Sequence, residues 1–181
     1  MSTQEAQVGT GVDVGQVEAM LRQEGQKRAA GNTLAFLSRH APFNKMAQAS
    51  LQLFADRAHI AFYPAGSLIV GPESGNVRYF HVIETGKVQA RQAGEVAMTE
   101  YSILSLGPGE CFPIGAVTAG RPSTNFYTAV EDTFCYHLPA EDFLTLMASS
   151  PEFNLFCTQY IASLLDQSRR QLQAQFAQKA S

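Results

Sequence analysis

Hydrophobic side chains change their spacing twice along this chain of 181 residues. From Val17 to Ala58 they recur every three or four positions, which is the period of amphipathic helices. From His59 to Leu138 that period gives way to short runs rich in β-branched and aromatic residues, most of them closed by glycine or proline. From Ala140 onward the helical spacing returns. The pattern therefore predicts a β domain with helices on both sides.

The N-terminal part is expected to contain short helices after an irregular start. Residues 1–15 hold glycines among small polar residues and show no period, so we expect them to be disordered. Two short helices should follow, separated by a break at Gly31-Asn32, with Asn32 or Thr33 capping the second. A third helix is predicted over Met46–Ala58.

Short strands joined by turn residues dominate the middle of the chain. Because turn signals rather than helical segments separate most of them, a parallel α/β sheet is excluded and a sandwich, barrel or jelly roll is favoured. The expected fold class is mainly β with flanking helices. The predicted strands are His59–Tyr63, Ser67–Val70, Val77–Ile83, Lys87–Arg91, Val96–Leu104, Asn125–Val130 and Thr133–Leu138.

The C-terminal part predicts a short helix over Ala140–Ser149 and a much longer one that begins near Pro151. Apolar residues from Phe153 to Phe176 keep a 3,4 spacing over roughly 40 Å of helix. A helix of this length cannot bury its whole stripe on one small domain, so Leu165, Leu172 and Phe176 are expected to meet another helix or domain, as in a homodimer. No stop signal follows Phe176, and we expect the chain to be a piece of a longer protein. The expected division is 1–15 disordered, 16–58 N-terminal helices, 59–139 β-roll and 140–181 C-terminal helices.

Composition and charge exclude several classes of function. With 13 Lys and Arg against 16 Asp and Glu, the chain lacks the basic excess of a nucleic-acid binder. No apolar run approaches the roughly 20 residues of a membrane span, and the N-terminus does not resemble a secretion signal. Three cysteines cannot all pair, which favours reduced thiols and a cytoplasmic protein. We therefore expect no nucleic-acid partner and no membrane.

Catalytic chemistry is not indicated by the spacing of the reactive residues. The histidines are spread along the chain without metal-ligand spacing and are expected to be half-buried or exposed on strands, and the thiols of Cys135 and Cys157 fall on apolar faces. No Ser, His and acid arrangement and no phosphate-binding glycine motif is present. We expect no enzyme, no metal and no cofactor. A cupin-like metalloenzyme remains an alternative that bound metal would reveal.

The segment 107–129, GPGECFPIGAVTAGRPSTNFYTA, is the candidate ligand site. It lies between two predicted strands and combines glycines and small residues with Arg121, Ser123 and Thr124. Exposed backbone N–H groups, an arginine fork and hydroxyls together suit a phosphate or a carboxylate. The other reading is an ordinary long connection whose arginine is solvated.

Four stretches resemble the cyclic nucleotide-binding domains in their order and spacing. The resemblance spans about Leu34 to Leu165 and implies a double-stranded β-helix (jelly-roll) β-roll with N-terminal helices and a long C-terminal helix. It also implies that 107–129 is the phosphate-binding cassette. The stretches are Tyr63–Gly66 as a first turn, Phe80–Ala90 as strand-turn-strand, Leu104–Phe112 as the entry to the cassette and Ala129–Met147 as its exit.

The cassette departs from the family pattern at both ends. Pro113 stands for a glycine, and Ile114 stands for the glutamate that would hold the ribose 2′-hydroxyl. At the far end Arg121 precedes a proline instead of following one. The resemblance therefore implies weak or no binding of cAMP and cGMP and a different anionic ligand. The implied ligand-binding residues are Gly115, Ala116, Arg121, Ser123 and Thr124.

The FPIGAV motif, the following RP and the glutamine-rich Leu164–Gln178 are similar to one bacterial branch of this family. In that branch the domain precedes a pair of CBS domains and a nucleotidyltransferase-like region. The resemblance implies a regulatory ligand-sensing module in signal transduction, with those domains as partners. One alternative is a dimerisation or assembly module that binds no ligand and uses the long helix. Another is a transcription regulator of the catabolite-activator type, which would need a helix-turn-helix after that helix.

Overall fold

The computed structural model describes residues 14–93 and 103–179, and these form a roll of two four-stranded antiparallel sheets with helices at one end. One sheet has the strand order β1-β8-β3-β6 and the other β2-β7-β4-β5. The strands are β1 His59–Tyr63, β2 Leu68–Val70, β3 Tyr79–Thr85, β4 Val88–Gln92, β5 Ile103–Leu106, β6 Cys111–Phe112, β7 Asn125–Ala129 and β8 Thr133–Pro139. The predicted β-roll fold is confirmed.

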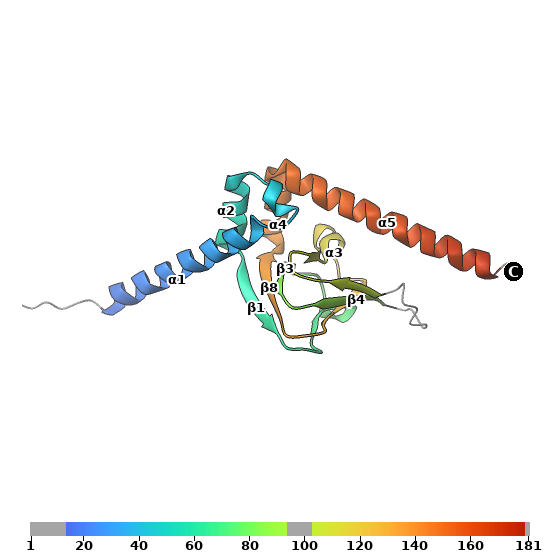
Figure 1. The fold of residues 1–181 in the computed structure, drawn as a ribbon, viewed down its shortest axis with the longest axis horizontal. Helices are drawn as coiled ribbons and strands as arrows, with labels where there is room; N and C mark the ends of the chain where they lie inside the picture. Colours follow the sequence, from blue (N-terminus) through green and yellow to red (C-terminus); the bar gives the residue numbers. More distant parts are fainter. Residues whose placement is uncertain (1–13, 94–102, 180–181) are drawn as a thin grey trace, which may run out of the picture.

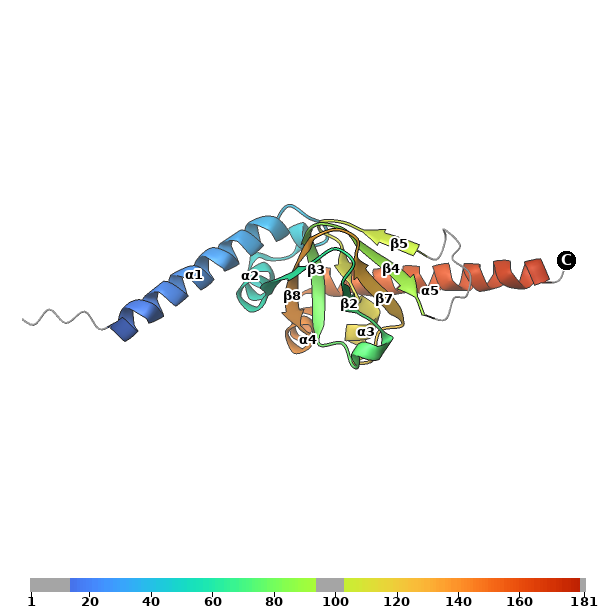
Figure 2. The ribbon, with the colours of Figure 1, turned by 90° about the horizontal axis from the view of Figure 1, so that it is seen from below.

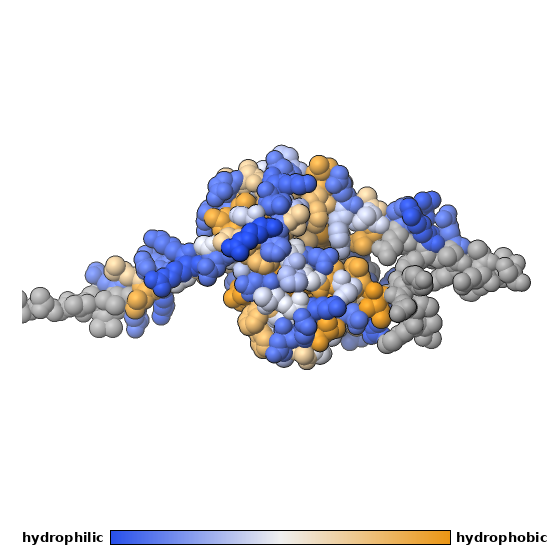
Figure 3. Space-filling view, in the orientation of Figure 1, coloured by the Kyte–Doolittle hydropathy of each residue, from blue (hydrophilic) through white to orange (hydrophobic). Residues whose placement is uncertain are grey.

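The helices gather at one end of the roll, and the two longest extend from it in opposite directions (Figures 1 and 2). The α-helices are α1 Val14–Leu37, α2 Gln48–Arg57, α3 Ile114–Thr118, α4 Ala140–Ser149 and α5 Pro151–Lys179. Two 3-10 turns, Phe43–Lys45 and Pro72–Ser74, complete the regular elements of the described residues. Hydrophilic side chains cover most of the projecting part of α1 (Figure 3).

An aromatic cluster fixes the helices to the outer face of the first sheet. Phe80 of β3 packs against Phe54 of α2, Phe143 of α4 and Phe153 of α5, with ring centroids 4.8–6.3 Å apart. Phe43 closes the cluster against Phe54 and Phe153. All five rings are fully buried, and burial of each contributes roughly 1.5–3 kcal/mol. This cluster places the first turn of α5, and thereby its path beside the roll.

The turn between β3 and β4 requires glycine at position 86. Gly86 has φ +94°, and a Cβ there would lie 2.6 Å from the carbonyl oxygen of Asp132. The backbone therefore approaches the start of β8 closely, and the Lys87 N–H donates to the Thr133 hydroxyl oxygen. This contact links the turn to the neighbouring hairpin.

The N-terminal helices differ from the sequence prediction. The break predicted at Gly31-Asn32 is wrong, because α1 continues through it to Leu37. The predicted cap at Asn32 or Thr33 is wrong as well: both lie inside the helix, and the Thr33 hydroxyl donates to the carbonyl oxygen of Ala29. A glycine within a helix costs only about 1 kcal/mol, which the burial of Leu37 outweighs.

The observed strands agree with the predicted runs to within a few residues, apart from one short strand. The pattern missed β6 and α3, which are too short to show a period. The predicted strand Val96–Leu104 is observed only from Ile103, and residues 96–102 lie outside the described part. Most of the segment predicted to be disordered also lies outside it, while Val14 and Gly15 belong to α1.

Candidate functional site

The cassette-like segment folds into a short strand, a single helical turn and a tight return loop. In α3 the N–H groups of Ala116 and Val117 both donate to the carbonyl oxygen of Pro113. Gly120, at φ +60°, reverses the chain after the helix. The Arg121 N–H then donates to the Ala116 carbonyl, and the Arg121 carbonyl accepts from the Val77 N–H. The backbone of Arg121 is thus held on both sides, while its side chain is exposed.

A cavity of about 300 Å³ lies between this segment, the second sheet and α5. Its walls come from the ends of β4 and β5, from α3 and the loop after it, from the start of β7 and from one face of α5. The lining residues are Ala90, Gln92, Ile103, Leu104, Pro113, Ile114, Gly115, Ala116, Arg121, Ser123, Thr124, Asn125, Tyr127, Tyr160, Ile161, Leu164 and Leu165.

The five residues implied as ligand contacts all border this cavity, but their side chains differ in availability. Arg121 and Thr124 are exposed, and no described residue forms a side-chain hydrogen bond or ion pair with either. Ser123 is only 3% exposed, and its hydroxyl donates to the Asn125 carbonyl and accepts from the Asn125 N–H. Ser123 therefore shapes the loop, whereas Arg121 and Thr124 present free polar groups. Gly115 and Ala116 contribute a small-residue wall.

The lining residues that the sequence did not reveal come mainly from α5. Tyr160, Ile161, Leu164 and Leu165 lie within two turns of that helix and line the cavity. Their 3,4 spacing predicted an apolar stripe but carried no signal of what the stripe faces. Leu165 remains 67% exposed beside the cavity. Of the other residues in the predicted helical seam, the side chains of Leu172 and Phe176 lie outside the described part.

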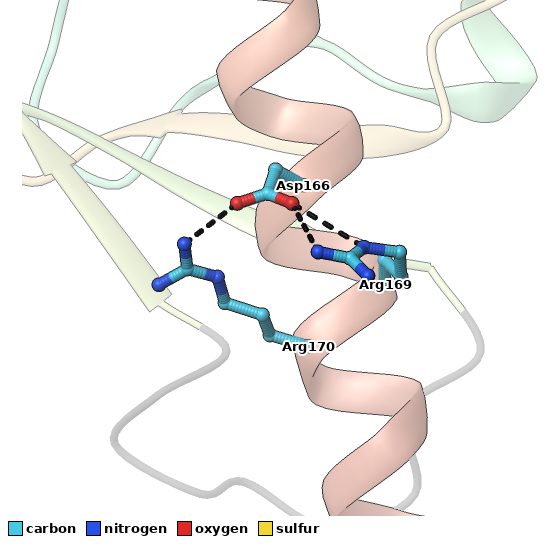
Figure 4. Close-up of polar contacts among 3 residues, drawn as sticks. All are labelled: Asp166, Arg169 and Arg170. Atoms are coloured by element: carbon cyan, nitrogen blue, oxygen red, sulfur yellow. Dashed lines mark hydrogen bonds and ion pairs between the residues drawn. The ribbon is translucent and has the colours of Figure 1, made fainter.

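Arg121 is the one charged residue among the described residues that line the cavity. Arg169 and Arg170 follow the cavity-lining residues on α5, and each lies 2.8 Å from a carboxylate oxygen of Asp166 (Figure 4). Hydrogen bonding from Arg169 and the charge of Arg170 lower the pKa of Asp166. Asp166 therefore pairs with both arginines and offsets one of their two positive charges, and the cavity wall itself carries the positive charge of Arg121.

Two tyrosines border the cavity with their hydroxyls kept neutral. Burial raises the pKa of Tyr127, and a hydrogen bond from the Asn125 side chain opposes that rise. Burial also raises the pKa of Tyr160. The Asn125 side chain therefore lies close enough to the Tyr127 hydroxyl to interact with it.

A row of histidines crosses the inner face of the first sheet, away from the cavity. His59, His137 and His81 are directly opposite one another on β1, β8 and β3, with ring centroids 5.4 and 4.4 Å from His137. His81 is 4% exposed and His137 6% exposed, so the expectation of half-buried or surface histidines is wrong for these two. The register places them inside the roll, where His81 stacks on Phe112. Burial, together with the charge of His59, lowers the pKa of His137 to about 4.

The three cysteine thiols lie inside the protein. Cys111, Cys135 and Cys157 are free and buried, and burial raises the pKa of the Cys135 and Cys157 thiols to about 12. No three His, Cys, Asp or Glu side chains in residues 14–93 and 103–179 are arranged to hold a metal ion. Among the same residues, no helix combines the length and apolar character of a membrane span.

Comparisons with solved structures identify the fold. The Thermus thermophilus catabolite activator protein is 24% identical at a TM-score of 0.52, over 72% of this chain and 59% of that one. The regulatory domain of Toxoplasma gondii PKA with cAMP is 17% identical at a TM-score of 0.65, over 75% of this chain and 51% of that one. The PKAR CBD2 domain with bound Sp-2Cl-cAMPS is 14% identical at a TM-score of 0.67, over 80% of this chain and 92% of that one. This chain thus spans little more than half of the first two proteins.

Sequence comparisons identify the family. A search of curated proteins found no match. The family model of the cyclic nucleotide-binding domain matches residues 60–150, from the start of β1 to the end of α4. The match includes the cassette-like segment with Arg121 and covers half of the sequence. The chain belongs to the cyclic nucleotide-binding domain family.

Proposed function

We propose that this chain is a regulatory ligand-sensing module in which a small anionic ligand occupies the cavity between the cassette and α5. The observation that carries the proposal is the position of Arg121. Its exposed guanidinium borders the cavity, and no described carboxylate neutralises it. A guanidinium fork beside a free hydroxyl, that of Thr124, suits the oxygens of a phosphate or carboxylate.

The regulatory output that we propose is a change in how α5 packs. Four α5 residues form part of the cavity wall, so a bound ligand contacts the helix and the roll at once. A ligand shifts the position of a helix only as far as it binds one arrangement better than another. Because α5 continues outward from the roll (Figure 1), such a shift would reach a domain that follows it. CBS and nucleotidyltransferase-like domains of a bacterial signalling protein are the partners that we propose there.

Cyclic nucleotides are expected to bind this cassette weakly. The related structures with cAMP or Sp-2Cl-cAMPS show which ligands this fold accommodates in other proteins. In this chain Ile114, which is 1% exposed, replaces the acceptor that the family pattern provides for the ribose hydroxyl. A buried hydroxyl without an acceptor costs about 1–3 kcal/mol, or roughly 5- to 150-fold in affinity.

The three free, buried thiols are compatible with a reducing compartment such as the cytoplasm.

Calorimetric titration tests this proposal. The chain is titrated with cAMP, cGMP, cyclic di-GMP and 1-naphthoate, and at least one anion is expected to bind with a stoichiometry of one. Replacing Arg121 by Gln should weaken that binding at least tenfold, because it removes a charge-assisted hydrogen bond. Arg39 is exposed in the turn that follows α1, and Arg39→Gln is the matched control, which should bind like the unaltered chain. No heat with any of the anions, or binding that survives Arg121→Gln unchanged, contradicts the proposal.

A second candidate function is a dimerisation module built on α5. Leu155 and Leu165 are 57% and 67% exposed on this helix. A partner helix that covered them would bury apolar surface that the single chain leaves in water. Sedimentation of Leu165→Glu and of Leu155→Glu tests this function: a dimeric mass that falls to the monomer supports it. A monomeric mass for the unaltered chain contradicts it.

A further inference from the structure

Few polar groups of the cavity wall are free to contact a ligand. The Ser123 hydroxyl forms both of its hydrogen bonds with the Asn125 backbone, and the Asn125 side chain interacts with Tyr127. Among the described residues, no side-chain hydrogen bond holds Gln92, Arg121, Thr124 or the Tyr160 hydroxyl, which all line the cavity. Gln92 and Asn125 are paired across β4 and β7, so Gln92 lies beside the same end of the cavity as Thr124. Gln92, Arg121 and Thr124 therefore form one cluster that can recognise one polar head, and the Tyr160 hydroxyl is a further polar group that comes from α5.

Apart from the hydroxyls of Tyr127 and Tyr160, the rest of the wall is mostly apolar, and it is partly open to water. Ile103 and Leu104 of β5 and Ile161, Leu164 and Leu165 of α5 line it. Leu104 is 43% and Leu165 is 67% exposed. A ligand with an apolar body would cover these side chains, and the removal of this apolar surface from water would favour binding. A sugar or another polyhydroxylated body would instead lose hydrogen bonds to water without finding partners on these residues.

The charge and the size of the cavity restrict the ligand further. The described wall carries the positive charge of Arg121 and no carboxylate, so a cation has no counter-ion there. A volume of about 300 Å³ is at the lower end of small-molecule sites, which suits a body of one or two fused rings or a medium-length alkyl chain.

We propose that the cavity binds an amphiphilic organic monoanion: one carboxylate or phosphate head on Arg121, Thr124 and Gln92, and an apolar body without hydroxyl groups against β5 and α5. This inference rests on the proposed function and specifies its ligand class. An aromatic acid and a medium-chain fatty acid share this chemistry, and the test has an arm for each.

The first experiment compares matched probes by calorimetry. The chain is titrated with 1-naphthoate and with decanoate, with their neutral counterparts 1-naphthamide and decanol, and with cAMP. At least one of the two acids should bind tenfold or more tightly than its neutral counterpart and tenfold or more tightly than cAMP. The same binding should weaken at least tenfold in Arg121→Gln and remain in Arg39→Gln.

The second experiment closes the cavity. A Cβ at Gly115 meets no atom within 4 Å, so Gly115→Leu adds its side chain to open space beside the cavity without displacing the core. Gly31→Leu in α1 is the matched control, because its Cβ also meets no atom within 4 Å and it lies outside the cavity wall. Binding of the acid should fall at least tenfold in Gly115→Leu and stay unchanged in Gly31→Leu, while far-UV circular dichroism shows both variants folded.

The outcomes separate this inference from the proposed function. If cAMP binds with dependence on Arg121 and both acids do not, the site is an anion sensor and the amphiphile assignment is overturned. If the acids bind equally well to Arg121→Gln and Gly115→Leu, they bind elsewhere and the assignment is overturned too. If no anion binds, both proposals are overturned.

Discussion

Acid should destabilise this protein through the histidine row inside the roll, and His137 allows the size of the effect to be worked out. Its pKa is lowered from 6.5 to about 4 by burial and by the charge of His59. His81, opposite it on β3, also has a lowered pKa, again chiefly because of burial. The tyrosines 63 and 79 complete the surroundings of His137, and the Tyr63 hydroxyl lies 2.9 Å from its Nε2.

The sign follows from proton binding in the two states. A histidine with a lowered pKa binds fewer protons in the folded protein than in the unfolded chain, so stability is fully present above pH 6.5 and is lost as the pH falls towards 4. Because each pKa unit corresponds to 1.36 kcal/mol, His137 alone lowers the free energy of unfolding by about 2 kcal/mol between pH 7 and pH 5. Because the pKa of His81 is lowered too, this residue reduces the free energy of unfolding further as the pH falls.

Urea unfolding at pH 7 and pH 5 measures this loss. Tyrosine fluorescence and circular dichroism are the probes, because the chain has no tryptophan. In His137→Gln, which keeps a hydrogen-bond partner for Tyr63, the difference between the two pH values should shrink by about 2 kcal/mol. Comparing pH differences within each protein removes any change in stability at pH 7 that the substitution itself causes. Equal pH differences in the two proteins would refute the reasoning.

Three further predictions concern packing and thiol chemistry. Phe80→Ala should lower the free energy of unfolding by about 3–5 kcal/mol because it opens a cavity among buried rings. Phe62→Ala, at a position 51% exposed, should lower it by less than about 1 kcal/mol. Urea unfolding of both variants measures these losses, and equal losses would contradict the packing. Gly86→Ala should lower the free energy of unfolding by about 2–4 kcal/mol in the same assay, because of φ +94° and the close contact with Asp132. Gly31→Ala in α1 should raise it by up to about 1 kcal/mol. The opposite order of stabilities would contradict the turn geometry. Ellman's reagent should react with none of the three cysteines in the folded protein and with all three in urea, and rapid reaction of Cys135 in the native state would contradict its burial.

The sequence predicted most strands because the turns between them are local, and the family resemblance implied that the strands form a β-roll. Glycine and proline close most strands, and runs such as His59–Tyr63 are rich in the β-branched and aromatic residues that favour strands. The continuity of α1 could not be predicted in the same way. Gly31 and Asn32 resemble a helix end, and the burial of Leu37 that outweighs them depends on packing against elements far along the chain.

The candidate site was predictable on one wall only. Glycines, an arginine and hydroxyls in one loop indicated the cassette and its anion, and Arg121 and Thr124 do border the cavity. The wall formed by Ile161 and Leu164 could not be predicted from the sequence, because periodicity shows that α5 has an apolar face but not what that face covers. The role of Ser123 could not be predicted either, because a hydroxyl at this position can hydrogen-bond a ligand or the backbone of its own loop. In the structure it donates to the Asn125 carbonyl.

The central claim, that the cavity between the cassette and α5 is the ligand site, is tested most directly by an NMR titration. Spectra of the ¹⁵N-labelled chain are recorded with saturating 1-naphthoate and, separately, with cAMP. At least one of them should shift the amide signals of Gly115 and Thr124 together with those of Ile161 and Leu164, while Gly31 in α1 stays unchanged. Shifts confined to other surfaces, or none with either anion, would contradict the account.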